Sequence, residues 1–225
     1  MRHVFSAIVL SGLSFAPLVA ADLSFADLRF SAGILSHEFK GSSSTTVTNG
    51  GATVSSSSSS NEGRDADDNF RGQLQFVSGH LGAGGGFVWG VGIAANHASF
   101  DNGSQEAKVT TPVVNLLAGY GFAFTPKWHF ELTPFVGAGR AYYSVTDNGS
   151  TNTSKEWNKY IEYGAKLGTY FVLGNGFILG VEVPYLVGRF EPEYTHTENN
   201  GDNYTVTDDR RNRGFGLLLT IGGRF

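Results

Sequence analysis

Cysteine is absent from the 225-residue chain, and methionine occurs once, as the first residue. Without cysteine there is no disulfide framework, no thiolate metal site and no cysteine nucleophile. Lysine and arginine number 16 against 20 aspartate and glutamate, which gives a formal net charge of -4. A mildly acidic chain is a poor ligand for nucleic acid, because neutralising phosphates requires clustered cations. We therefore expect no nucleic-acid partner, and no motif in the sequence indicates a cofactor.

Long apolar runs are also missing after the first twenty residues. No later stretch approaches the ~20 apolar residues that a membrane-spanning helix needs, and the mean hydropathy of the chain is slightly polar. A helical membrane protein would be far more apolar. A membrane β-barrel need not be, because half of each of its strands faces a polar lumen.

The first 21 residues have the pattern of a secretory signal peptide. Arg2 and His3 form a short basic region, residues 4–13 are apolar, and Val19-Ala20-Ala21 places small residues before a cleavage site. We expect residues 1–21 to be removed and residues 22–225 to form one transmembrane β-barrel domain. The alternative is that the apolar run stays in place as a membrane anchor.

The last strand ends in an aromatic residue, with apolar residues at every second position before it. Leu217, Leu219, Ile221 and Phe225 lie on one face of this strand. The segment resembles the carboxy-terminal signal by which the barrel-assembly machinery of bacterial outer membranes selects its substrates. The resemblance implies that this face meets lipid and that the machinery is a partner during biogenesis.

Alternation of apolar and polar residues predicts about eight strands. Their ranges are 26–39, 70–79, 86–100, 109–124, 128–145, 160–173, 177–190 and a last strand that ends at Phe225. The connections at 79–85, 125–127 and 174–176 are short, whereas those at 41–69, 101–107, 146–157 and 191–212 are mostly longer and polar. Outer-membrane barrels alternate short periplasmic turns and long outward loops in this way. The predicted fold is all-β, an antiparallel transmembrane β-barrel of about eight strands with long outward loops.

One strand carries a motif as well as an alternation. Thr133-Pro134-Phe135-Val136-Gly137-Ala138-Gly139 resembles the Pro-aromatic-Val-Gly-x-Gly strand of small OmpA/OmpX-type barrels. With the terminal Phe225, it makes the whole mature chain resemble that superfamily. The resemblance implies the outer membrane of a Gram-negative bacterium, reached by secretion through the periplasm. It does not select a function.

Two of the outward loops contain hairpin patterns of their own. Residues 45–48 and 52–54 flank Asn49-Gly50-Gly51, and residues 194–198 and 204–207 flank Asn199-Asn200-Gly201-Asp202. Asparagine and glycine favour tight turns between strands. We expect the barrel strands to continue past the membrane as a protruding sheet.

Ionisable residues occur on the faces of the strands that should line the lumen. They are Arg29, Arg71, Glu131, Glu162, Lys166, Glu182 and Arg224. An unpaired ion in a dry interior costs several kcal/mol, so we expect an ion-pair network in which Glu131, Lys166 and Glu182 meet across the lumen. The network is either a structural plug or a gate for small solutes. About eight strands leave an interior that side chains nearly fill, which argues against a wide pore.

Two further groups suggest chemistry at the outward end. Arg210, Arg211 and Arg213 form a basic cluster that either contacts lipid phosphates of the outer leaflet or pairs with Asp208 and Asp209. His97 and Ser99 share one face of their strand, as in the His-x-Ser pair of some lipid A deacylases. An imidazole can act as the base for such a hydroxyl, with Glu106 or Asp101 orienting it. We favour an ordinary strand end here and predict neither a catalytic nor a metal site.

These patterns together indicate a porin-like surface protein of the outer membrane with a structural or binding role. Its outward hairpins would contact lipid, lipopolysaccharide, a host surface or another extracellular ligand that the sequence does not identify. A narrow channel for small solutes is the alternative function, and a lipid A-modifying hydrolase is the second alternative. No long periplasmic domain follows the predicted barrel, so we do not expect a two-domain peptidoglycan anchor.

Overall fold

The computed structural model describes residues 22–49, 52–82, 84–101, 105–147, 153–191, 193–197 and 203–225. The predicted signal peptide, residues 1–21, lies outside this part of the chain. The described residues form ten strands: β1 Leu23–Asn49, β2 Ala52–Asp65, β3 Asp68–Leu81, β4 Gly86–Asp101, β5 Gln105–Thr125, β6 Trp128–Asp147, β7 Thr153–Val172, β8 Phe177–Glu191, β9 Glu193–Thr197 and β10 Asn203–Arg224. None of the described residues forms a helix that could cross a membrane.

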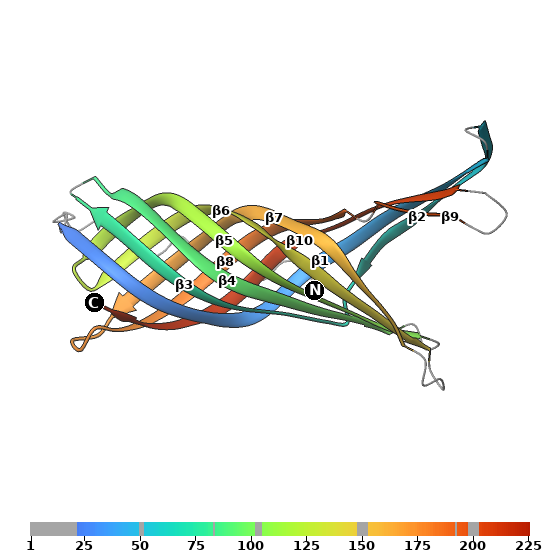
Figure 1. Cartoon of the computed structure of the whole chain (residues 1–225). Helices are drawn as coiled ribbons and strands as arrows, with labels where there is room; N and C mark the ends of the chain where they lie inside the picture. Colours follow the sequence, from blue (N-terminus) through green and yellow to red (C-terminus); the bar gives the residue numbers. More distant parts are fainter. Residues whose placement is uncertain are drawn as a thin grey trace, which may run out of the picture.

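Eight of the strands close into a barrel (Figure 1). The ring runs β1–β3–β4–β5–β6–β7–β8–β10, and β10 pairs with β1 from Asp27↔Arg224 to Thr48↔Asn203. Every pairing around the ring is antiparallel. A closed ring satisfies the backbone hydrogen bonds of its strands without exposing a sheet edge to lipid. The prediction of an antiparallel barrel of about eight strands is confirmed.

The other two strands prolong the barrel wall outward. β2 takes the place of β3 beside the second half of β1, and β9 takes the place of β8 beside the first residues of β10. The β1–β2 ladder ends at Asn49↔Ala52, around the predicted turn, and β9 pairs with β10 from Asn203↔Thr197 to Thr207↔Glu193. Both predicted hairpins are therefore present. We call β2, the outer half of β1, the outer half of β10, and β9 the first outward sheet.

The outer ends of four other strands form a second outward sheet. β4, β5, β6 and β7 remain paired as far as Asp101↔Glu106, Gln105↔Asp147 and Thr146↔Thr153. The ladder between β3 and β4 stops at Asp68↔Ser99, and no pairing joins the two sheets beyond it in the described residues. Figure 1 shows the sheets leaving the barrel as two diverging arms on the right. The barrel thus opens into a two-armed structure on the side opposite the start of β1 and the end of β10.

The barrel is apolar outside and polar inside. In β6, Leu132 is 46% exposed on the outer wall, whereas the neighbouring Thr133 is fully buried in the lumen. The same alternation exposes large apolar side chains on all eight barrel strands. A continuous apolar surface of this extent matches a hydrocarbon solvent rather than water. The facing predicted from the period of two is confirmed, and the chain is an outer-membrane β-barrel.

The lumen is narrow, so a strand needs glycine at a lumen-facing position where large side chains of adjacent strands fill the space. A Cβ atom at Gly137 would collide with the side-chain amide of Asn115 and press on the stem of Glu162. Glycine at this position lets two polar side chains occupy the space that its own side chain would fill. The outer surface makes no such demand at Gly72, where a Cβ would meet nothing within 4 Å.

Candidate functional site

The middle of the lumen holds eight charged residues, which we call the lumen network. They are Asp27, Arg29, Arg71, Glu131, Glu162, Lys166, Glu182 and Arg224. Four are cations and four are carboxylates, so the network is electrically balanced. Balance matters here because a charge out of water needs a partner close by.

Arg29 is the centre of the periplasmic half of the network. Its guanidinium donates two hydrogen bonds to Glu131, of 2.8 and 2.7 Å, and one of 2.7 Å to Asp27. The same group lies 3.8 Å from the ring centre of Tyr170. Glu131 also contacts His129, with 3.1 Å between Oε1 and Nε2. A planar guanidinium can make two carboxylate contacts and an aromatic contact together, which an ammonium group cannot do as well.

Glu182 is the next centre along the lumen. Its carboxylate accepts hydrogen bonds from Lys166 at 3.1 Å, from the Tyr170 hydroxyl at 2.8 Å and from Gln73 at 2.6 Å. The structure therefore brings Lys166 to Glu182, while Glu131 contacts Arg29 and His129. The sequence predicted that Lys166, on the strand next to that of Glu131, would meet Glu131. In the structure Arg29, which lies on β1 across the ring from β6, pairs with Glu131 instead.

The outward half of the network is built around Arg71 and Glu162. These residues form a bidentate ion pair with distances of 3.2 and 2.8 Å. Asn96 and Asn115 donate to the same carboxylate, at 3.1 and 3.0 Å. Gln73 joins the two halves, because it accepts from Arg71 at 3.1 Å and donates to Glu182. Hydrogen bonds therefore connect Glu162, Arg71, Gln73 and Glu182, and Arg29 contacts this set through the ring of Tyr170, which donates to Glu182.

Apolar clusters lie at both ends of the lumen. The periplasmic cluster contains Leu23, Phe25, Val77, Leu81, Val88, Leu117, Ala123, Phe135 and Leu186. The outward cluster contains Ala94, Val109, Val113, Ala141, Tyr160 and Phe190, with Phe39, Phe100 and Tyr143 packed against it. Phe39 and Phe100 meet edge to face, with ring centres 4.9 Å apart.

The seam between the first and last strands is bridged by side chains as well as by backbone. Arg224 forms a bidentate pair with Asp27, Ser31 contacts Thr220 at 2.9 Å, and Arg213 reaches Glu38 at 3.3 Å. Sequence reasoning placed Asp27 on the polar face of its strand but did not include it in the network. The signal was available, because Asp27 is two residues from Arg29 and so shares its face.

The basic cluster of the last strand is divided by the period of two. Arg210 turns toward the interior of the outward sheets, where its guanidinium lies 5.0 Å from the ring centre of Tyr143. Arg211 and Arg213 are exposed on the outer face. Arg213 pairs with Glu38, and the side chains of Asp208 and Asp209 lie outside the described set. The three arginines therefore do not form one patch.

His97 and Ser99 do not contact each other. His97 Nδ1 lies 3.0 Å from the hydroxyl of Thr110, and Ser99 donates to Asp68 at 3.5 Å. Each side chain is therefore hydrogen-bonded to a residue of a neighbouring strand, His97 to Thr110 and Ser99 to Asp68. No group of three His, Asp or Glu residues among those described could hold a metal ion.

The predicted assembly signal lies on the outer wall of the barrel. Leu217, Leu219 and Ile221 are exposed, and Phe225 is 84% exposed. The backbone N–H of Phe225 donates to the carbonyl of Ala26 at 3.0 Å, so the last residue is still aligned with β1. The apolar row is continuous with the lipid-facing surface.

A closed barrel with an apolar wall, a charged and filled interior, and long outward strands defines a small outer-membrane β-barrel protein. No protein-family model and no curated protein matches the chain. Solved structures with a similar arrangement include the attachment invasion locus protein Ail of Yersinia pestis, with 14% identity, a TM-score of 0.37, and coverage of 89% of this chain and 99% of Ail.

Two further similar structures are OprG of Pseudomonas aeruginosa and the outer-membrane protease OmpT of Escherichia coli. OprG has 13% identity, a TM-score of 0.34, and coverage of 90% of this chain and 97% of its own. OmpT has 10% identity, a TM-score of 0.33, and coverage of 94% and 99%. Identities and TM-scores this low carry no argument about function, so the conclusions drawn for this chain come from its own strand register and side-chain burial.

Proposed function

We propose that this chain is a non-conducting surface protein of the outer membrane, whose barrel anchors two outward sheets that bind an extracellular partner. The observation that carries the proposal is the filled lumen beneath strands that continue past the membrane. The charged groups of the lumen network pair with one another, and two apolar clusters pack beside them in the barrel. Surfaces that can engage a ligand are therefore on the outward sheets.

The free edge of β2 is the most specific binding surface of these sheets. β2 is fourteen residues long and pairs only with β1 among the described strands. Its centre, residues 55–58, is serine with exposed side chains. An exposed edge presents unpaired N–H and C=O groups that an extended peptide can complete by adding a strand. The partner that fits this edge is an extended polypeptide segment.

A row of cations crosses the outer wall where the sheets leave the barrel. Lys40, Arg211 and Arg189 lie directly opposite one another on β1, β10 and β8, and all three are exposed. The three cations make this strip of the wall positive, and Lys40 also pairs with Glu38 at 3.0 Å. Phosphates of outer-leaflet lipid or lipopolysaccharide are anions at this level of the membrane. We assign this row, rather than Arg210, to contact with lipid phosphate.

The absence of conduction is tested in a planar bilayer. Refolded protein should give no unitary current steps above those of protein-free vesicles. A variant in which Arg71 and Glu162 are both alanine, with Phe39 and Phe100 also alanine, serves as the opened control. Current steps from the wild-type protein would favour the small-solute channel and contradict the proposal.

The edge is tested with a labelled peptide that copies residues 38–49, the strand that β2 already accepts on its other side. Fluorescence anisotropy should report saturable binding to the protein in nanodiscs. Ser56→Pro and Ser57→Pro form a matched pair, because successive N–H groups of a strand point to opposite edges. One of them should weaken peptide binding about tenfold while hydrogen exchange of β1 stays unchanged. Equal binding by both variants and the wild type would exclude strand addition at this edge.

A further inference from the structure

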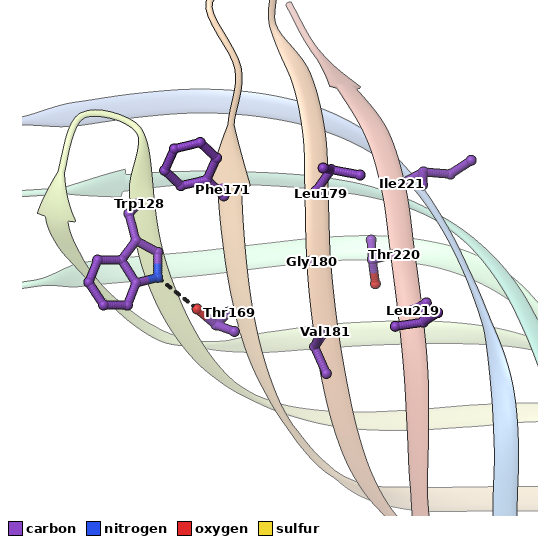
Figure 2. A pocket seen from close by; sticks show the side chains of 9 residues that line it. All are labelled: Trp128, Thr169, Phe171, Leu179, Gly180, Val181, Leu219, Thr220 and Ile221. Atoms are coloured by element: carbon purple, nitrogen blue, oxygen red, sulfur yellow. Dashed lines mark hydrogen bonds between the residues drawn. The ribbon is translucent and has the colours of Figure 1, made fainter. Parts of the chain in front are cut away.

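The outer wall of the barrel has a groove near its periplasmic end (Figure 2), with a volume of about 450 Å³. Two rows of outward side chains form its sides. The first row runs from Trp128 on β6 to Ile221 on β10, and the second from Thr169 on β7 to Leu219 on β10. Between the rows lies the backbone of Gly180, where an added Cβ would point toward Tyr170 in the lumen and not into the groove. The volume lies within the range of small-ligand sites.

One hydrogen bond gives this apolar groove a polar point. The indole Nε1 of Trp128 donates to the hydroxyl of Thr169 at 2.9 Å, as the dashed line in Figure 2 shows. The hydroxyl accepts this bond through a lone pair, so its own proton remains available to donate. Thr169 is a polar residue in a lipid-facing row, between Leu167 and Phe171. Its hydroxyl lines the groove and can rotate to donate its proton to an occupant.

A cation is adjacent in sequence to the groove residue Trp128. Lys127 precedes Trp128 in the β5–β6 turn and is exposed. The carbonyl of Lys127 accepts a hydrogen bond of 2.7 Å from the backbone N–H of Val172, which holds the turn against β7. No carboxylate of the described residues forms an ion pair with the Lys127 ammonium group. Its charge is therefore available to an anion at the membrane surface.

We propose that this groove is a binding site for one glycerophospholipid of the periplasmic leaflet. An acyl chain lies between the two rows of side chains, the Thr169 hydroxyl donates to an ester carbonyl, and the Lys127 ammonium group binds the phosphodiester. The three features follow the order of the lipid itself, from the hydrocarbon past the ester to the phosphate. Trp128 lies at the level of the ester, where an indole has apolar and polar neighbours together. The site is independent of the outward sheets.

The experiment uses lipid with brominated acyl chains, which quenches tryptophan on contact. Two single-tryptophan proteins are prepared in detergent micelles, one retaining Trp128 and the other retaining Trp89, with the remaining tryptophans changed to phenylalanine. Trp89 is also exposed on the lipid-facing wall, on β4, and reports general contact with lipid. Brominated phosphatidylglycerol is added at increasing mole fraction in each case.

Trp128 should be quenched saturably, at a mole fraction roughly three- to tenfold lower than Trp89, as one charge-assisted and one neutral hydrogen bond predict. Lys127→Gln and Thr169→Val should each move the Trp128 curve toward that of Trp89. Lys108→Gln, which removes an exposed lysine at the outward end of β5, should leave it unchanged. Brominated diacylglycerol, which keeps the esters but lacks the phosphate, should show a smaller preference for Trp128 than phosphatidylglycerol does.

Three results would overturn the proposal. The first is identical quenching of Trp128 and Trp89 by phosphatidylglycerol. The second is equal preference for diacylglycerol, which would remove the role of Lys127. The third is a protein dimer that shields Trp128 from lipid at all concentrations, which would make the groove a contact between two copies. Far-ultraviolet circular dichroism and heat-modifiable mobility of each variant establish that a lost preference is not a lost barrel.

Discussion

Asp27, near the start of β1, receives a bidentate pair of hydrogen bonds from Arg224, the penultimate residue of the chain, at 2.8 and 3.0 Å. The same carboxylate accepts a bond of 2.7 Å from Arg29. The pairing of β10 with β1 that closes the barrel therefore also brings Arg224 to Asp27 and completes the lumen network. A chain whose last strand has not reached β1 leaves Asp27 short of one cation and Arg224 without its carboxylate.

Asp27→Asn should destabilise the folded barrel by about 3–5 kcal/mol, because it leaves Arg224 without its carboxylate and Arg29 with Glu131 as its one remaining carboxylate. Arg224→Gln should cost less, since the side chain of Arg224 remains 13% exposed. The measurement is the urea concentration at which the compact form disappears from unheated electrophoresis samples. Asp22→Asn, at an exposed position, is the matched control. Equal midpoints for Asp27→Asn and Asp22→Asn would show that the seam does not depend on this pair.

Glu131 should couple strongly to Arg29 and weakly to Lys166. The two hydrogen bonds from Arg29 are direct, whereas Lys166 donates to Glu182. Double-mutant cycles between Glu131→Gln and either Arg29→Gln or Lys166→Gln measure the two interaction energies. We expect on the order of 1–3 kcal/mol for the first pair and a few tenths for the second. The opposite order would mean that Lys166 rather than Arg29 neutralises Glu131.

Leu132→Arg should cost about 2–4 kcal/mol, because it places a charge in the hydrocarbon part of the bilayer. Thr133 is the neighbouring residue on the same strand but faces the lumen. A spin label at Leu132 should therefore respond to lipid-soluble oxygen, and one at Thr133 should not. Greater oxygen access at Thr133 would invert the assignment of faces on β6.

Removal of Phe225 should lower the amount of protein in the outer membrane and raise its degradation in the periplasm. The residue adds no lumen contact, and its side chain is largely exposed, so its effect should fall on assembly rather than on stability. Phe225→Tyr, which keeps an aromatic end, should assemble more fully than the deletion. Undiminished heat-modifiable barrel in outer-membrane fractions of the deletion would remove the assembly role.

Gly137→Ala should destabilise the barrel by about 1–3 kcal/mol, because the added carbon overlaps the Asn115 amide in the lumen. Gly72→Ala, on the outer wall with nothing nearby, should be neutral or slightly stabilising. Thermal unfolding of the two variants in the same detergent compares them directly. A loss of stability at Gly72 equal to that at Gly137 would show that strand flexibility, and not lumen packing, sets the requirement.

Strand positions could be predicted well because lipid and lumen impose opposite chemistry on alternate residues. The period of two alone places Leu132 and Thr133 on different faces, and their burial agrees. Strand ends were less certain: β1 was expected to end near residue 39 and continues to Asn49. Beyond the membrane both faces of a strand meet water, so the alternation that locates a strand weakens there. In these outer segments the turn residues, such as Asn49 before two glycines, are what indicate a hairpin in the sequence.

By itself, the sequence determined which solvent each residue meets, because the period of two is a local property of a strand. Only the tertiary structure decided which lumen charges pair. Arg29 reaches Glu131 from a strand 102 residues away in the chain, and ring closure brings Arg224 to Asp27 across 197 residues. These partners depend on the register and curvature of the whole barrel. The same holds for the groove at Trp128 and Thr169, since its walls come from four strands whose side-by-side order exists only in the folded ring.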